Sequence, residues 1–139
     1  MTTTAAPAAG SATRVLRVLV VDDDAMNLRI AARLLRELGH TGALVTDGNK
    51  ALAILEQQTF DLMLLDVLMP GLDGLSTLQA VRKREKIRPG QRRLPVLMVS
   101  GHDSADTQQH FRSAGADGFV AKPLSSAVLK SEVARLVPR

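Results

Sequence analysis

The sequence predicts an α/β sandwich, in which helices cover both faces of a five-stranded parallel sheet. Five short, mostly apolar runs alternate along the chain with amphipathic patterns of helical period. The runs are apolar on both faces, as is typical of parallel strands covered on both sides. Strict alternation of strand and helix also implies right-handed crossovers. With 45% hydrophobic residues among 139, the chain can bury the core of one such domain.

Each element follows from a local pattern. The predicted strands are residues 15–21, 43–46, 62–66, 95–100 and 118–121. The predicted helices are residues 26–38, 48–58, 74–86, 104–114 and 125–137. Gly39 and Gly115 stand where helix ends favour a left-handed residue, and Ser104 and Ser125 stand where N-caps are favoured.

The folded domain is expected to span residues 14–139. Residues 1–13 consist mostly of Thr, Ala, Pro, Gly and Ser, which cannot bury apolar surface, so we expect a flexible leader or linker there. The chain contains no cysteine, which excludes disulfides and thiolate metal sites. No apolar run approaches the roughly 20 residues of a membrane span. We therefore expect a cytoplasmic domain without membrane contact.

The positive net charge could suggest a polyanionic partner, but its distribution and the low aromatic content argue against nucleic acid. The formal net charge is +4, and much of the excess lies in residues 82–93, which we interpret as a solvated helix end and loop. The aromatic residues are Phe60, Phe111 and Phe119, which are too few for a surface that stacks bases or a flavin ring.

Polar residues follow the predicted strands at the edge where their carboxyl ends meet. They are Asp22, Asp23 and Asp24 after the first strand, Asp66 at the third, Ser100 at the fourth and Lys122 after the fifth. In such sheets ligands bind at this edge. Carboxylates that lie close together repel unless a cation neutralises them, and oxygen ligands suit a hard ion such as Mg²⁺.

These residue types are the ones that phosphoryl transfer to an aspartate requires. The transition state spreads negative charge over oxygens that a metal ion, an ammonium and a hydroxyl stabilise. Asp66 stands alone at the middle strand and is the predicted nucleophile. Taken singly, Asp22 or Asp23 could equally cap the following helix, and Asp24 is the better candidate for that cap. Only the joint placement of the polar residues favours a functional site.

Four segments in order resemble the signatures of response-regulator receiver domains from two-component systems. They are VLVVDDD (18–24), LLDVLMPGLDG (64–74), PVLMVSG (95–101) and GFVAKP (118–123). The resemblance extends from about Arg14 to Leu136, and Asn27 with LRELGH (35–40) is most similar to receivers of hybrid histidine kinases. It implies a flavodoxin-like fold with strand order 2-1-3-4-5.

The resemblance also implies roles for single residues. Asp66 corresponds to the phosphorylated aspartate, and Asp22, Asp23, Asp66 and the main-chain carbonyl of Leu68 correspond to the ligands of Mg²⁺, with Mn²⁺ as a substitute. Ser100 corresponds to the hydroxyl that shifts toward the phosphoryl group.

Three further family features fall near the last strand. Lys122 corresponds to the ammonium that pairs with acid and phosphoryl oxygens, and the Lys122–Pro123 bond resembles a cis peptide of the family. Phe119 corresponds to the switch aromatic, although it lacks the hydroxyl of a tyrosine. Phosphorylation is then expected to change the surface formed by the fourth helix, the fifth strand and the fifth helix.

The resemblance further implies a partner and excludes an ordinary enzyme. The expected phosphoryl donor is the phosphohistidine of a histidine kinase or a histidine phosphotransfer domain. A kinase or output domain can be fused outside this chain, which would make it the cytoplasmic part of a membrane-bound sensor. Intrinsic autophosphatase activity is expected, and Leu68 and His102 lie at positions that tune the access of hydrolytic water.

The main alternative is a phosphohydrolase of the haloacid-dehalogenase type. Asp22 would then be the nucleophile and Asp24 the acid and base, with Ser100 and Lys122 as later motifs. Against it, we find no paired acids at a fourth strand end and no inserted cap, and Asp66 would have no role. A flavin module would need a phosphate-binding loop after the first strand, where three aspartates would repel the anion.

Overall fold

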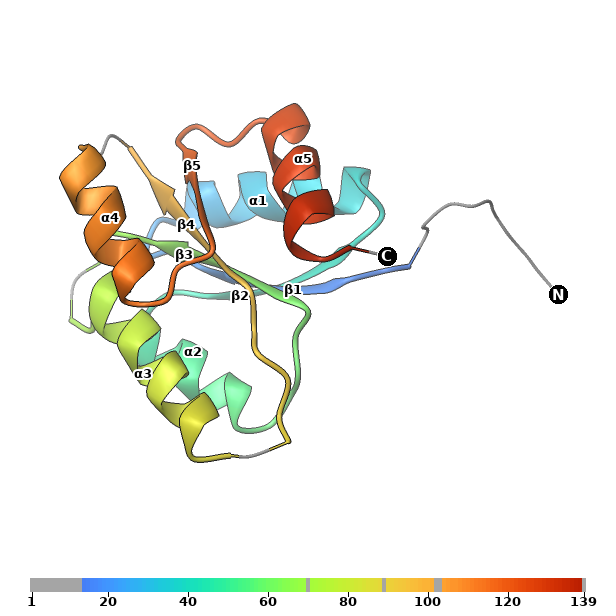
Figure 1. The fold of residues 1–139 in the computed structure, drawn as a ribbon. Coiled ribbons are helices and arrows are strands. Elements are labelled where there is room, and N and C mark those ends of the chain that lie inside the picture. Colours follow the sequence, from blue (N-terminus) through green and yellow to red (C-terminus); the bar gives the residue numbers. More distant parts are fainter. Residues whose placement is uncertain (1–13, 70, 89, 102–103, 139) are drawn as a thin grey trace, which may run out of the picture.

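The computed structural model describes residues 14–69, 71–88, 90–101 and 104–138 (Figure 1). The expected leader, residues 1–13, and His102 lie outside these ranges. The strands are β1 (Arg17–Val21), β2 (Thr41–Val45), β3 (Leu62–Asp66), β4 (Val96–Ser100) and β5 (Gly118–Ala121). The helices are α1 (Ala25–Glu37), α2 (Gly48–Leu55), α3 (Gly74–Lys86), α4 (Ala105–Ser113) and α5 (Ser126–Leu136). None of the helices in these ranges is long and apolar enough to cross a membrane.

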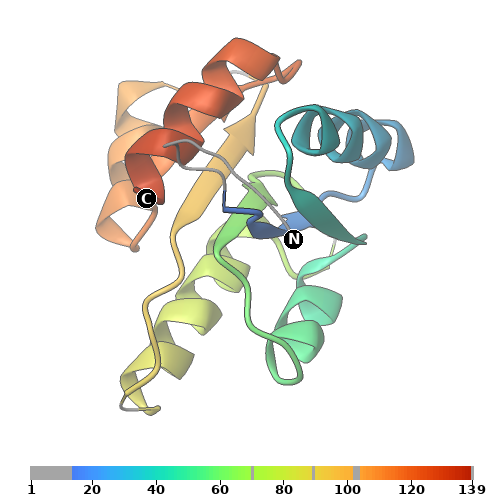
Figure 2. The same cartoon turned by 90° about the vertical axis from the view of Figure 1, so that its right-hand side faces the viewer.

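All five strands are parallel, in the order β2-β1-β3-β4-β5. The flavodoxin-like order expected from the resemblance is therefore confirmed. Helices α1 and α5 cover one face of the sheet, and α2, α3 and α4 cover the other (Figures 1 and 2). The sheet is thus the middle of three layers, and its carboxyl edge remains open for a site.

Two separate apolar cores hold the layers together, because successive side chains of a strand point to opposite faces. Leu64 and Leu97 pack against α1 and α5, whereas Met63 and Met98 pack against α2, α3 and α4. Every residue of β3 and β4 is buried, as predicted for strands covered on both sides.

The edge strand β2 departs from this prediction. Its residues are exposed or half-buried, since it has only β1 as a neighbour. It also begins two residues before the predicted run 43–46, because Thr41 and Gly42 pair with β1 although neither is apolar. Helix α2 ends at Leu55, earlier than the predicted residue 58, since the amides of Glu56 and Gln57 donate to carbonyls only three residues back, in a tighter turn than the α-helix.

Side-chain caps fix where the helices begin, and glycines fix where two of them end. The hydroxyls of Ser104 and Ser125 accept from the amides of α4 and α5, as predicted. Gly39 and Gly115 follow α1 and α4 with φ of 87° and 113°, a region that favours glycine. Asp24 caps α1, since its carboxylate accepts from the amides of residues 26 and 27.

The basic segment 82–93 is only partly the solvated surface that the sequence predicts. The side chain of Arg82 is 12% exposed. Its guanidinium donates to the carbonyls of Leu94 and Gly115 and forms ion pairs with Glu85 (2.8 Å) and Asp117 (2.9 Å). These contacts connect α3 to the segments that lead into β4 and β5, so Arg82 anchors the amino edge of the sheet.

Candidate functional site

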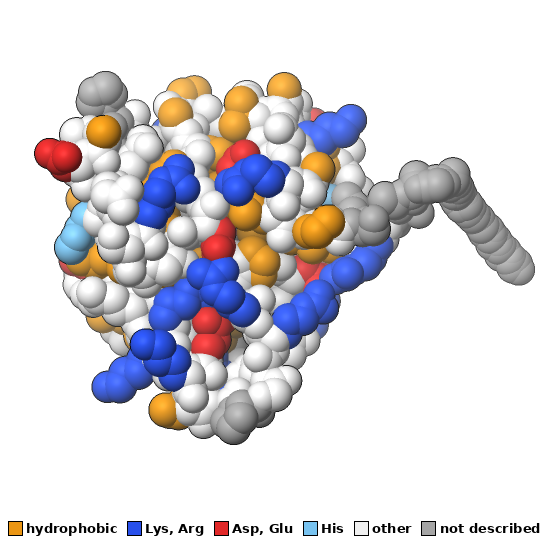
Figure 3. Space-filling model, viewed as in Figure 1, with side chains coloured by type: hydrophobic (Ala, Val, Ile, Leu, Met, Phe, Trp, Pro, Cys, Tyr) orange, Lys and Arg blue, Asp and Glu red, His pale blue; other side chains and the backbone are white. Residues whose placement is uncertain are grey.

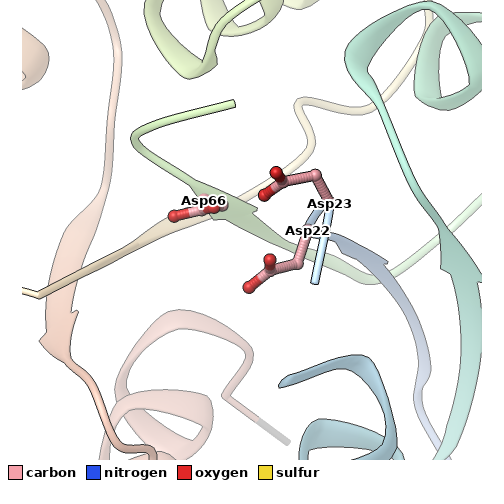
Figure 4. A group of neighbouring side chains, drawn as sticks. All are labelled: Asp22, Asp23 and Asp66. Carbon is pink, nitrogen blue, oxygen red and sulfur yellow. The ribbon is translucent and has the colours of Figure 1, made fainter. Parts of the chain in front are cut away.

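Three carboxylates meet at the carboxyl edge of β1 and β3 (Figure 4). One oxygen each of Asp22, Asp23 and Asp66 lies within 4.8 Å of the others. Asp22 and Asp66 are buried, whereas Asp23 is exposed to solvent. The register explains this proximity, because Val21 pairs with Leu65, which places Asp22, the residue after β1, beside Asp66, the last residue of β3.

The turn after β1 holds the acidic residues in fixed directions. The amide of Asp22 donates to the carbonyl of Val45 (3.2 Å), and a carboxylate oxygen of Asp22 accepts from the amide of Asp24 (2.9 Å). Asp24 is engaged as the cap of α1. It is therefore not part of the carboxylate cluster, as the sequence predicts.

A glycine allows α3 to begin directly against the end of β3. A Cβ atom at Gly74 would lie 2.4 Å from the carbonyl oxygen of Asp66 and 2.8 Å from that of Val67, which is closer than side chains tolerate. Sequence reasoning did not assign Gly74 a role, although it lies within the quoted segment 64–74. Its position in that motif was the signal that could have identified it.

Lys122, which follows β5, brings a positive charge to the carboxylate cluster. Its ammonium lies 2.9 Å from Oδ1 of Asp66 and 3.6 Å from Oδ2 of Asp22. The amide of Lys122 donates to the carbonyl of Ser100 (2.7 Å), which fixes the chain after β5 to the end of β4. The Lys122–Pro123 peptide is cis, as the resemblance implies.

Burial controls the ionisation of Asp66. Its desolvation raises the pKa of the carboxyl above the ordinary value, and the nearby charge of Asp22 raises it further, although the ammonium of Lys122 and the amide of Leu68 oppose this. Desolvation, the largest single effect, lowers the pKa of Lys122, but the carboxylates of Asp66 and Asp22 together outweigh it and raise the pKa above the ordinary value. The ammonium is therefore retained beside the carboxylates.

The donor set fits a hard divalent cation. Within the described residues, Oδ1 of Asp66 is buried without a hydrogen bond, because the contact with Lys122 has the distance of an ion pair but not hydrogen-bonding geometry. Three carboxylates face one ammonium, so negative charge is in excess. Carboxylate and carbonyl oxygens are the ligands that Mg²⁺ prefers.

The two predicted switch residues lie on β4, which pairs with β3, and on β5, the strand beyond it. Ser100 ends β4 and is buried, one position beyond Val99, which pairs with Asp66. Phe119 lies in β5 and is half-buried. Its ring meets Phe111 of α4 edge to face, with centroids 5.9 Å apart.

The Phe119 ring also has a cationic neighbour, the side chain of Arg112. The guanidinium of Arg112 lies 5.4 Å from the ring centroid, within the range of a cation–π contact. Sequence reasoning missed this neighbour and Phe111, because no local pattern connects α4 to β5. Leu68, whose carbonyl the resemblance assigns to the metal, is 80% exposed.

The family model for the response regulator receiver domain matches residues 18–134. The chemotaxis protein CheY of Pseudomonas aeruginosa is 38% identical over 125 residues, which cover 89% of this chain and 98% of that protein. The sensor protein GacS of Pseudomonas syringae is 36% identical over 120 residues. That match covers 86% of this chain but only 13% of the sensor protein.

Solved structures show the same architecture. The receiver domain of a sensor histidine kinase from Pseudomonas aeruginosa, which has a magnesium ion in its active-site cleft, superposes with a TM-score of 0.78 at 28% identity, covering 91% of this chain and all of that one. A response regulator from Chloroflexus aurantiacus gives a TM-score of 0.81 at 28% identity, with coverage of 91% and 100%.

The raised pKa of Asp66 allows the effect of Lys122 on this carboxyl to be tested in metal-free protein. Replacing Lys122 by Met removes the ammonium that lowers this pKa, so the Lys122→Met variant should titrate Asp66 at higher pH than the wild type. The measurement is the carboxyl ¹³C shift of Asp66 against pH in the presence of a chelator. An unchanged or lower value in the variant would mean that Lys122 does not act on Asp66.

Proposed function

Because the chain belongs to the response regulator receiver domain family of two-component systems, we propose that Asp66 is the residue that accepts the phosphoryl group. Receiver domains are phosphoryl acceptors and not ordinary enzymes. The observation that carries the proposal is the geometry around Asp66. Its carboxylate ends the central strand, with Asp22 and Asp23 on one side and the Lys122 ammonium 2.9 Å away.

The reaction transfers the phosphoryl group between two side chains. A carboxylate oxygen of Asp66 attacks the phosphorus of a phosphohistidine, a P–O bond forms, and the P–N bond breaks with its electrons returning to the imidazole. Lys122 is placed to hold an oxygen of the group in transfer, while burial excludes water from the nucleophile. The donor is a histidine kinase or a phosphotransfer domain, with which receiver domains interact.

Receiver domains bind Mg²⁺, and the chain carries the ligands to do so. We infer that Asp22, Asp23, Asp66 and the main-chain carbonyl of Leu68 hold the ion. When bound, Mg²⁺ neutralises charge on the transferring oxygens. The same hard oxygen ligands suit Mn²⁺, which we propose as a functional substitute. The solved kinase receiver with magnesium in its cleft supports this assignment.

Ser100 and Phe119 are the proposed switch residues. A phosphoryl group on Asp66 would attract the Ser100 hydroxyl through a charge-assisted hydrogen bond. The space that Ser100 leaves would allow the Phe119 ring to turn inward from its contact with Arg112. The change would then reach the surface formed by α4, β5 and α5, which a partner can read.

The haloacid-dehalogenase alternative is not supported. The family match is to receivers over residues 18–134, and Asp24, which would be the acid and base, is used as a helix cap. Intrinsic autophosphatase activity stays a proposal, in which Leu68, which is 80% exposed, would tune the access of hydrolytic water to the phosphorylated Asp66.

The wider setting of the domain follows from its relatives. CheY consists almost entirely of this domain, whereas in GacS it is a small part of a sensor kinase, so both free and fused arrangements are compatible with the chain. We propose a domain of residues 14–139 in the cytoplasm, preceded by the linker 1–13. The three phenylalanines of the chain support the proposal that nucleic acid is not a partner.

Phosphorylation by acetyl phosphate with Mg²⁺ tests the central residue. Intact-mass measurement should show the gain of one phosphoryl group, and peptide mapping should place it on Asp66. The Asp66→Asn variant should show none, because an amide is not a nucleophile here. The matched control is Asp24→Asn, since Asn caps helices as well as Asp, and it should be labelled as the wild type is. Phosphate on another residue would disprove the assignment.

Beryllofluoride, which mimics the phosphoryl group, tests the switch. Amide NMR shifts with and without it should change in α4 and β5 as well as around Asp66. In the Ser100→Ala variant the changes in α4 and β5 should shrink, because the hydroxyl that connects the two regions is missing. Changes that stay within the immediate pocket of the wild type would rule out the proposed switch.

A further inference from the structure

A cavity lies at the opposite edge of the sheet from Asp66. It has a volume of about 550 Å³, in the range of pockets that hold small molecules. Residues 58–61, which lead into β3, form one wall, and residues 91–95, which lead into β4, form another. The end of α5 closes a third side. A ligand there would leave the phosphorylation site accessible.

The floor of this cavity is apolar. Leu55, Val81, Leu94 and Val137 line it and are all at least nine-tenths buried. Phe60 adds a half-buried aromatic ring, which the guanidinium of Arg17 meets at 5.0 Å from the centroid. An apolar or aromatic group entering the cavity would therefore exchange water for apolar contacts.

The charged residues of the wall are three arginines and two carboxylates. The carboxylate of Asp61 is paired with Arg14, and that of Glu85 is paired with Arg82 at 2.8 Å. Both partners lie outside the set of residues that line the cavity. The two carboxylates of the wall are thus paired with arginines from outside it, although Arg82 divides its charge between Glu85 and Asp117.

Those arginines, Arg84, Arg92 and Arg93, retain a surplus of positive charge. Arg84 shares the single carboxylate of Glu56 with Arg88, and Arg93 shares that of Asp117 with Arg82.

Arg92 is exposed and has no ion-pair partner in the part of the chain that the structure describes. Figure 3 shows Lys and Arg side chains gathered over the end of α3, at this edge of the molecule.

The guanidinium groups of these three arginines also have N–H donors that can bind a ligand. Each carries five N–H groups in a planar fork that matches phosphate, sulfonate or carboxylate oxygens. Arg84 is held in place by Glu56 and by the carbonyl of Leu55 (2.7 Å), and these contacts leave part of its fork unused. Its side chain is only 15% exposed, so its orientation is fixed before a ligand arrives.

We propose that this cavity binds a small organic anion, whose apolar body rests on the Leu94 and Phe60 floor and whose phosphate, sulfonate or carboxylate head meets Arg84, Arg92 and Arg93. The combination of an apolar floor and a cationic rim selects for molecules that carry both parts. A simple inorganic anion would lack the contacts with the floor, and a neutral apolar molecule would leave the surplus charge unmatched.

The test uses two probes that differ in charge. The sulfonate 1-anilinonaphthalene-8-sulfonate should bind saturably to the full chain, with amide shift changes at residues 55–61 and 91–95. Its neutral analogue N-phenyl-1-naphthylamine should bind more weakly at the same residues. Affinity for the sulfonate should fall as salt rises from about 50 mM to about 500 mM, because exposed charges are screened.

Variants separate the cavity from the general charge of the protein. Arg92→Glu should weaken sulfonate binding by about fivefold or more, the scale of one exposed ion pair lost and reversed. The control Arg29→Glu makes the same change of charge on α1, away from the cavity, and should leave the affinity as it is. Unfolding curves check that both variants remain folded.

The proposal would be overturned by the absence of saturable sulfonate binding, by shift changes that map to another surface, or by equal affinity in the wild type and Arg92→Glu. Equal losses in Arg92→Glu and Arg29→Glu would also overturn it, because the effect would then come from net charge and not from the cavity.

Discussion

The proximity of three carboxylates at one edge of the sheet is the constraint on which the rest of the site depends. Two unit charges no more than 4.8 Å apart repel by at least about 3.5 kcal/mol at an effective dielectric constant of about 20. That is a large fraction of the roughly 5–15 kcal/mol by which a domain is stable. The fold therefore needs compensating positive charge, which Lys122 supplies in part. A divalent cation would supply the rest.

The same constraint explains why the surrounding backbone is so closely specified. Asp22 is fixed through Val45 and the cap of α1, and Asp66 is approached closely by Gly74 at the start of α3. Lys122 is tied to the end of β4 through the carbonyl of Ser100. These contacts hold the charged groups close together despite the repulsion between the carboxylates. The free energy gained by packing the two apolar cores offsets the cost of that repulsion.

The two edges of the sheet carry opposite charge and have different tasks. The carboxyl edge is acidic and is proposed to accept the phosphoryl group, whereas arginines anchor the amino edge. Arg82 joins α3 to the segments before β4 and β5, so we expect the amino ends of these strands to stay in place while their carboxyl ends respond to phosphorylation. A ligand in the cavity lined by Arg84, Arg92 and Arg93 would bind beside the anchored amino ends of these strands.

Much of the fold could be predicted from the sequence, because strands, helices and caps leave local patterns. Those patterns located Asp66, the caps Asp24, Ser104 and Ser125, and the meeting of polar residues at one edge. The contacts of Arg82 could not be predicted, since its partners are up to 35 residues away. The exposure of β2 depends on its place in the sheet order, which came from the resemblance alone.

The metal requirement is the most direct test of the account. Calorimetric titration of Mg²⁺ into the wild-type chain should show one binding site, and the Asp23→Ala variant should lose it, because two carboxylates and an ammonium leave little net charge to hold the ion. Asp23 is exposed, so the variant should keep its fold. Unchanged Mg²⁺ affinity in Asp23→Ala would place the metal elsewhere and contradict the account.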